Sequence, residues 1–138
     1  MSGPIAVTGA AGFIGGAVVR ELASAGRDVT ACDIGPAPAW LPSSVRWVQG
    51  SVTDVAVLDA TLAGAEVAIH LAFRMDLDAS DPVASVQTNL LGSTHVFDSA
   101  LRHRLQRVVW ASSVMVYGPL ACYARVPVDE SAEPMPRT

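Results

Sequence analysis

Short apolar runs alternate along the chain with longer stretches whose apolar positions repeat at helical spacing. The apolar runs predict five strands, over residues 4–9, 28–33, 45–50, 66–73 and 107–112. These runs are nearly continuously apolar, which is typical of strands covered by helices on both faces. Strands that alternate with helices predict parallel β-α-β units joined by right-handed crossovers.

Three helices are predicted between the strands. The first follows the glycines near residue 12, and its predicted inner face holds Ile14, Val18 and Leu22, flanked by Phe13, Ala17 and Val19. The second covers residues 55–62. The third begins at Asp81 and Pro82, a capping acid followed by a residue favoured in a first helical turn. Its apolar stripe consists of Val83, Val86, Leu90, Phe97, Leu101 and Leu105.

The periodicity ends at Gly118. The residues that follow are rich in proline and predict a loop, with Pro119, Pro127, Pro134 and Pro136 among them. We therefore expect one folded domain over residues 1–118 and a Pro-rich loop tail over residues 119–138.

Composition narrows the possible functions. With 51% hydrophobic residues in a chain of 138, the sequence can bury the core of one domain. The net charge of −4 argues against a surface that follows nucleic-acid phosphates. No apolar run reaches the roughly 18 residues of a membrane span, and the N-terminus has no recognisable leader. Cys32 and Cys122 form neither a disulfide framework nor a metal motif. We expect a cytoplasmic protein without nucleic-acid, membrane or metal partners.

The stretch VTGAAGFIGG, residues 7–16, places Gly9, Gly12 and Gly15 between a predicted strand and a predicted helix. The first N–H groups of a helix have no partner within the helix, and the helix dipole adds partial positive charge there. Glycines let this backbone approach a pyrophosphate closely. The loop is therefore predicted to bind a dinucleotide, with a tight structural turn as the alternative.

Asp33 closes the second predicted strand, 24 positions after Gly9. A carboxylate there can accept hydrogen bonds from the adenosine ribose hydroxyls. It would repel a 2′-phosphate, so the sequence favours NAD over NADP as the cofactor. The alternative is an ordinary loop acid.

Four further motifs extend the glycine motif TGAAGFIGG of residues 8–16. They are IHLA at 69–72, NLLGS at 89–93, VWASS at 109–113 and VYG at 116–118. In order and separation they resemble the extended short-chain dehydrogenase/reductase family, in its NAD-dependent epimerase/dehydratase group. The resemblance covers nearly the whole chain. It implies an α/β fold with a Rossmann-like, doubly wound parallel sheet of about five strands.

The resemblance implies a role for each motif. Those that would contact NAD are Gly9, Gly12, Phe13, Ile14 and Gly15 at the pyrophosphate, Asp33 at the ribose, Ser51 and Val52 at the adenine, and Leu71 and Ala72 at the nicotinamide ribose. Asn89 would order the backbone near the cofactor, and Ser113 would be the catalytic hydroxyl that hydrogen-bonds to the substrate. The family usually has an acid where this chain has Ser51, so we expect weaker adenine recognition.

Two residues of these motifs, His70 and Ser113, could instead have a purely structural role. His70 has apolar neighbours, which favours a packed histidine over a catalytic base. Ser113 could simply end the fifth strand.

The resemblance also implies a catalytic Tyr-x-x-x-Lys pair, in which the lysine lowers the pKa of the tyrosine that takes the substrate proton. This chain has Tyr117 and Tyr123 but no lysine. Its tail resembles the family's segment just before that pair. We therefore expect the NAD-binding domain of an epimerase/dehydratase-type oxidoreductase acting on a nucleotide sugar, truncated before the C-terminal strands and the substrate domain.

Three further expectations concern partners. A small-molecule substrate is expected to be turned over only if the chain is completed. The alternatives are a non-catalytic dinucleotide-binding module and a subunit completed by a partner. A sheet that stops after its fifth strand leaves an edge and an apolar helix face exposed, which predicts a homo-oligomer.

Overall fold

The structure is a computed structural model that describes residues 3–75 and 78–136. Its centre is one parallel sheet in the order β3-β2-β1-β4-β5. The strands are β1 (Ile5–Thr8), β2 (Val29–Asp33), β3 (Arg46–Gln49), β4 (Val67–His70) and β5 (Arg107–Trp110). The sheet confirms the Rossmann-like, doubly wound class predicted from the sequence. Each strand lies within its predicted range, and those ranges are longer because they include turn residues.

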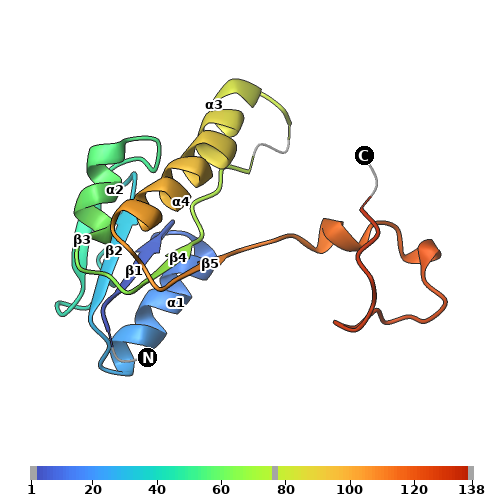
Figure 1. Ribbon diagram of the computed structural model, residues 1–138, viewed down its shortest axis with the longest axis horizontal. Helices are drawn as coiled ribbons and strands as arrows, with labels where there is room; N and C mark the ends of the chain where they lie inside the picture. Colours follow the sequence, from blue (N-terminus) through green and yellow to red (C-terminus); the bar gives the residue numbers. More distant parts are fainter. Residues whose placement is uncertain (1–2, 76–77, 137–138) are drawn as a thin grey trace.

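Helices cover both faces of this sheet, with α1 on one side and α2 and α4 on the other (Figure 1). They are α1 (Phe13–Ser24), α2 (Val55–Leu62), α3 (Pro82–Val86), the π-helical turn η1 (Gln87–Gly92) and α4 (Ser93–Arg102). Two short 3₁₀ turns follow β5, η2 (Val114–Tyr117) and η3 (Leu120–Cys122). The predicted cap of α3 is confirmed, because the Asp81 carboxylate accepts a hydrogen bond from the Ala84 N–H at 3.1 Å.

The alternation of side chains along β1 divides the core into two layers. Ile5 and Val7 pack with Val19 of α1 on one face of the sheet. Ala6 points to the other face, where it packs with Leu62 of α2. Both layers are buried because β1 lies between β2 and β4 and has helices above and below it. This burial explains why the strand is apolar at every position except its last.

The inner face of α1 differs from the predicted one. Val18 and Leu22 pack against the core as expected, and Val19 is fully buried. Ile14, however, is 60% exposed, and the residues buried in the first turn are Gly15 and Gly16. The first turn of α1 lies so close to the end of β1 that only glycine fits between them, which turns Ile14 outward.

The long third helix was predicted as one continuous element, but the π-helical turn η1 divides it. The wider turn changes the helical phase, so a stripe drawn at regular spacing does not follow one face. The buried residues of η1 and α4 are Gly92, Val96, Ser99 and Ala100, and Val96 packs with Val52 and with Leu58 of α2. The predicted stripe lies mostly outward instead, with Val83, Val86, Leu90, Phe97 and Leu101 exposed. The homo-oligomer stays a prediction, and these side chains are the surface it concerns.

After β5 the chain leaves the layered body and runs to a separate tail that contains η2 and η3 (Figure 1). β5 itself is an edge strand with little cover, and Trp110 at its end is 57% exposed. The domain boundary at residue 118 stays a prediction. In the described part of the chain, the helices are too short or too polar to span a bilayer.

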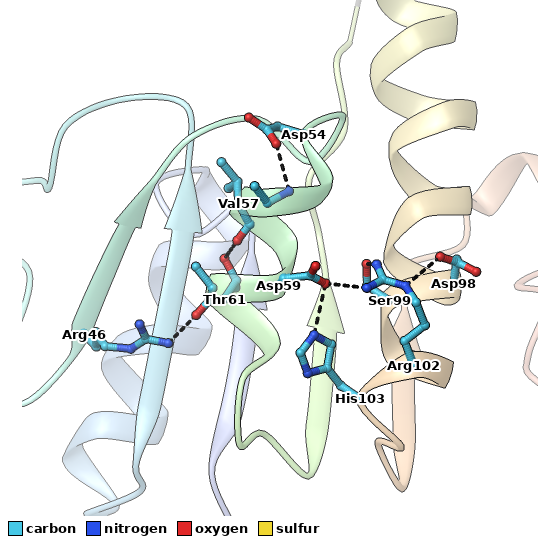
Figure 2. Close-up of polar contacts among 11 residues, drawn as sticks. Arg46, Asp54, Val57, Asp59, Thr61, Asp98, Ser99, Arg102 and His103 are labelled. Atoms are coloured by element: carbon cyan, nitrogen blue, oxygen red, sulfur yellow. Dashed lines mark hydrogen bonds and ion pairs between the residues drawn. The ribbon is translucent and has the colours of Figure 1, made fainter.

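A charged cluster on the surface joins α2 to the end of α4 (Figure 2). One carboxylate oxygen of Asp59, on α2, accepts hydrogen bonds from Arg102 at 2.8 Å and from His103 at 3.0 Å. Arg102 also donates to Asp98, one helical turn earlier, at 3.0 Å. The hydrogen bond from His103, with help from Arg102, holds the pKa of Asp59 below its usual 3.8. The cluster therefore fastens the two helices that cover this face.

We expect Asp59→Asn to lower the free energy of unfolding near neutral pH, because the native state stabilises the ionised carboxylate. A lowered pKa means that this stabilisation is present above pH 3.8 and is lost as the pH falls through the lowered value. Urea unfolding midpoints of both proteins at neutral and acid pH would measure it. Asp28→Asn is the control, since this exposed acid has no side-chain partner among the described residues. Equal neutral midpoints for wild type and Asp59→Asn would contradict the expectation.

Candidate functional site

The sheet changes direction of winding between β1 and β4, since β2 and β3 lie on one side of β1 while β4 and β5 lie on the other. In open α/β sheets the loops at the carboxyl ends of the strands separate at this point and leave a crevice. A cavity of about 480 Å³ opens there, a volume typical of ligand sites. Its lining consists of Gly9, Ala11, Gly12, Cys32, Asp33, Ile34, Gly50, Ser51, Val52, Leu71, Ala72, Phe73, Arg74 and Thr88.

The glycine loop forms the floor of this cavity through close backbone contacts. Gly9 has a φ of +69°, and a Cβ there would lie 2.5 Å from the Ala72 nitrogen after β4. A Cβ on Gly15 would overlap the carbonyl oxygen of Gly9. The three glycines therefore have different positions. Gly9 and Gly12 line the cavity, whereas Gly15 is buried behind the loop and lets α1 approach β1.

The N-terminus of α1 opens toward the same loop. Gly12 is its N-cap, and within the described chain no side chain caps it and no acid lies in its first turn. Its first N–H groups, including those of Phe13 and Ile14, have no partner within the helix and favour an anion. The Phe13 side chain is 98% exposed, and neither it nor Ile14 lines the cavity. Any contact of these two residues with a ligand in the cavity would be made by the backbone.

Asp33 joins the end of β2 to the glycine loop. One of its carboxylate oxygens accepts a hydrogen bond from the Ala11 N–H at 2.9 Å, and the other from the Ile34 N–H at 2.8 Å. Each oxygen keeps a further lone pair for a ligand hydroxyl. The carboxylate is thus held in place at the cavity before any ligand arrives.

The end of β3 continues this wall with Ser51 and Val52. The Ser51 hydroxyl oxygen accepts a hydrogen bond from the Thr53 N–H at 3.1 Å and lies 2.8 Å from the Thr53 hydroxyl. Val52 is buried. Ser51 thus presents a neutral hydroxyl group at the lining of the cavity.

The opposite wall follows β4 and includes the predicted Leu71 and Ala72. Asn89 of η1 does not line the cavity, but its side chain binds the backbone of Arg74, which does. Its side-chain oxygen accepts from the Arg74 N–H at 2.7 Å, and its amide donates to the Arg74 carbonyl at 2.9 Å. This pair of bonds fixes the backbone of Arg74. The role that the resemblance implied for Asn89, ordering the backbone near the cofactor, stays a prediction.

Ser113 lies apart from the cavity. Its hydroxyl accepts a hydrogen bond from the Met115 N–H at 3.2 Å and so caps η2, at the start of the tail. The structure therefore brings seven of the predicted residues to the lining of one cavity, namely Gly9, Gly12, Asp33, Ser51, Val52, Leu71 and Ala72. The remaining predicted residues do not line it, namely Phe13, Ile14, Gly15, Asn89 and Ser113.

Sequence reasoning missed several lining residues beside the motifs, namely Ala11, Cys32, Ile34, Gly50, Phe73, Arg74 and Thr88. Most of these residues lie next to the end of a predicted strand, and this position in the sequence could have identified them as lining residues. Arg74 is the one cation among the described lining residues, and its guanidinium lies 3.6 Å from the Asp81 carboxylate. Burial raises the pKa of the Cys32 thiol, so the thiol is neutral. The charged groups of the lining are thus Asp33 at one end and Arg74 at the other.

Comparison with known proteins gives a family and a set of relatives. The model of the NAD dependent epimerase/dehydratase family matches residues 5–138. The dTDP-glucose 4,6-dehydratase of Streptomyces antibioticus is 35% identical over 130 residues, which cover 83% of this chain and 38% of the relative. A short-chain dehydrogenase/reductase superfamily protein from Agrobacterium tumefaciens, solved with bound NAD, matches with a TM-score of 0.81 and 30% identity, over 98% of this chain and 40% of that one.

A further solved structure, MoeE5 in complex with UDP-glucose and NAD, matches with a TM-score of 0.78 and 32% identity. The match covers 97% of this chain and 43% of MoeE5. The chain thus spans about two fifths of the length of these relatives. NAD, the cofactor favoured by the sequence, is the cofactor bound in both solved structures.

We expect Gly15→Ala to destabilise the fold by about 1–3 kcal/mol, since the added methyl meets backbone that cannot turn aside. Gly35→Ala is the matched control, because a Cβ at Gly35 has no neighbour within 4 Å among the described residues. Denaturant unfolding of the two variants beside wild type measures the difference. Equal losses in both variants would show that the close approach of α1 to β1 is not the cause.

Proposed function

Because the chain belongs to the NAD-dependent epimerase/dehydratase family, as its motifs predicted, we propose that the cavity at the β1–β4 crevice binds NAD. The observation that carries the proposal is the pairing of an uncapped helix N-terminus with a fixed carboxylate across one cavity. The first suits a pyrophosphate and the second suits a ribose. A dinucleotide carries both groups in one molecule.

The proposed binding mode places the adenosine half over Asp33, Ser51 and Val52. The pyrophosphate then lies against Gly9, Gly12 and the first N–H groups of α1. The nicotinamide ribose reaches the backbone of Leu71 and Ala72, while Asn89 keeps the chain beyond them in place through Arg74. Gly15 supports the mode indirectly, by allowing α1 to begin where it does.

Asp33 makes NAD the preferred cofactor over NADP. Its two oxygens accept hydrogen bonds from the backbone N–H groups of Ala11 and Ile34, which hold the carboxylate in place at the cavity. An ionised carboxylate accepts well from ribose hydroxyls and repels a 2′-phosphate. Cationic groups that could receive this phosphate are absent from the described lining near Asp33, since Arg74 lies on the wall after β4.

For the whole protein we propose an oxidoreductase of the epimerase/dehydratase type that acts on a nucleotide sugar. Support comes from the dTDP-glucose dehydratase among the relatives and from the UDP-glucose bound to MoeE5. NAD supplies a hydride acceptor in such chemistry. In this chain Ser113 is the proposed catalytic hydroxyl, although it lies outside the cavity.

A second candidate follows from the composition of these 138 residues. They include no lysine, so they do not contain the Tyr-x-x-x-Lys pair that the resemblance implies. The alternative function is a dinucleotide-binding module, or a subunit whose catalytic pair comes from a partner. NAD binding without turnover by the purified chain would agree with this candidate, and turnover of a nucleotide sugar would exclude it.

We expect calorimetric titration to show saturable NAD binding, at least about tenfold tighter than NADP binding. Asp33→Asn keeps the shape of the side chain but removes its charge. We expect this change to weaken NAD binding by about ten- to a hundredfold, the range for a hydrogen bond to a charged group.

Asp28→Asn is the matched control for this titration, because Asp28 immediately precedes β2 whereas Asp33 ends it. The control should bind NAD as tightly as wild type. Absence of saturable NAD binding in wild type would refute the proposed function. Equal affinities of wild type and Asp33→Asn would refute the role of Asp33.

A further inference from the structure

A series of hydrogen bonds, buried at His70 and part-buried at Ser93, runs from β1 to η1. His70, at the end of β4, is 1% exposed. Its Nδ1 lies 2.7 Å from the hydroxyl oxygen of Thr8, the last residue of β1. Its Nε2 lies 3.0 Å from the hydroxyl oxygen of Ser93, and Ser93 donates to the Asn89 carbonyl at 2.6 Å. Three segments that are far apart in the sequence are joined by one imidazole.

The number of available protons fixes which group donates in each of these hydrogen bonds. The Ser93 proton is used in the bond to the Asn89 carbonyl, because a carbonyl can only accept. Ser93 must therefore accept from His70, which places the ring proton on Nε2. The neutral ring then has Nδ1 as an acceptor, and Thr8 donates to it. Burial agrees with a neutral ring, since it lowers the pKa of His70 to about 4.

The turn η1, which these hydrogen bonds hold, contacts both walls of the cavity. Within η1, Thr88 lines the cavity and Asn89 fixes the backbone of Arg74. At the other end of the turn, a Cβ on Gly92 would lie 2.6 Å from a methyl group of Val52. The turn thus contacts the wall after β3 and the wall after β4. A shift of η1 would move both walls together.

Side-chain hydrogen bonds reinforce the π-helical turn. A π turn is wider than an α turn and is rare in helices. Hydroxyls of two successive residues bind carbonyls inside it, Ser93 to Asn89 and Thr94 to Leu90. Thr94 is on the exposed side and binds only within the helix, whereas Ser93 also connects the turn to His70 and the sheet.

We propose that His70 and Ser93 are positioning residues for the cofactor cavity: through the Nε2–H tautomer of His70 they anchor the π-helical turn η1 to the sheet, and the anchored turn sets the spacing of the two walls. The proposal rests on the proposed NAD binding for its effect on affinity. The anchoring itself is a property of the free protein. It gives a buried histidine a task other than proton transfer to substrate.

Ser93→Ala tests the anchor, because it removes the acceptor of the His70 proton and the donor to Asn89. We expect native-state hydrogen exchange of the Arg74 amide to become about three- to tenfold faster, as for the loss of one buried hydrogen bond. Exchange in the core of β1 should not change. We also expect the Kd for NAD to rise about three- to tenfold. Ser93→Thr, which keeps the hydroxyl, should restore both values.

Thr94→Ala is the matched control, since it removes the neighbouring hydroxyl-to-carbonyl bond of the same turn but leaves the link to His70 intact. It should leave Arg74 exchange and NAD affinity near wild type. Equal effects of the two alanine variants, or unchanged Arg74 exchange in Ser93→Ala, would overturn the proposal.

The nitrogen-15 spectrum of His70 in the free wild-type protein provides a measurement that needs no variant. A ring proton on Nε2 is expected, and a proton on Nδ1 would overturn the proposal even if Ser93→Ala failed to fold. Failure of wild type to bind NAD would refute the proposed function alone. Hydrogen exchange and the imidazole spectrum would then still decide whether the anchor exists.

Discussion

The close approach of the α1 backbone to the end of β1 is the constraint on which the rest of the structure depends. Gly15 faces the Gly9 carbonyl oxygen with no room for a side chain, and Gly9 faces the backbone after β4 in the same way. These contacts set the start of α1, and they bring the turn after β1 against the turn after β4. The floor of the cavity is therefore made of backbone, which can come closer to an anion than side chains allow. Ile14 and Phe13 point outward for the same reason.

Two polar connections hold the walls around this floor. Asp33 ties the end of β2 to the glycine loop through the Ala11 N–H, so the group proposed to recognise the ribose also shapes the pyrophosphate site. His70 ties the ends of β1 and β4 to the π-helical turn. Both connections are short, and that of His70 is buried where an unpaired polar atom would be costly. The cavity is therefore organised before a ligand enters, which lowers the ordering cost of binding.

The edge strand β5 and the tail that follows it are more exposed than the strands around the cavity. The sheet ends at β5, whose Trp110 meets Phe97 of α4 edge to face but stays largely exposed. The tail with η2 and η3 lies beyond it, and Ser113 caps η2 at its start. For the chemistry proposed above, Ser113 would have to lie near the nicotinamide end of the cavity. In this structure Ser113 lies in the tail and the cavity lies in the layered body. These 138 residues span about two fifths of the length of their relatives.

The sequence by itself determined the strands, their parallel arrangement, the glycine loop and the acid that ends β2. Each of these depends on near neighbours, on apolar runs, on glycine spacing or on a residue at a strand end. Only the tertiary structure decided the outward face of the long helix, the π-helical turn, the clamp of Asn89 on Arg74 and the bonds of His70 to Thr8 and Ser93. Those contacts join residues 15 to 62 positions apart, and they exist because the order β2-β1-β4 brings distant strand ends together. A local pattern carries no information about which segment will lie opposite it, so the anchor of η1 could be found only in three dimensions.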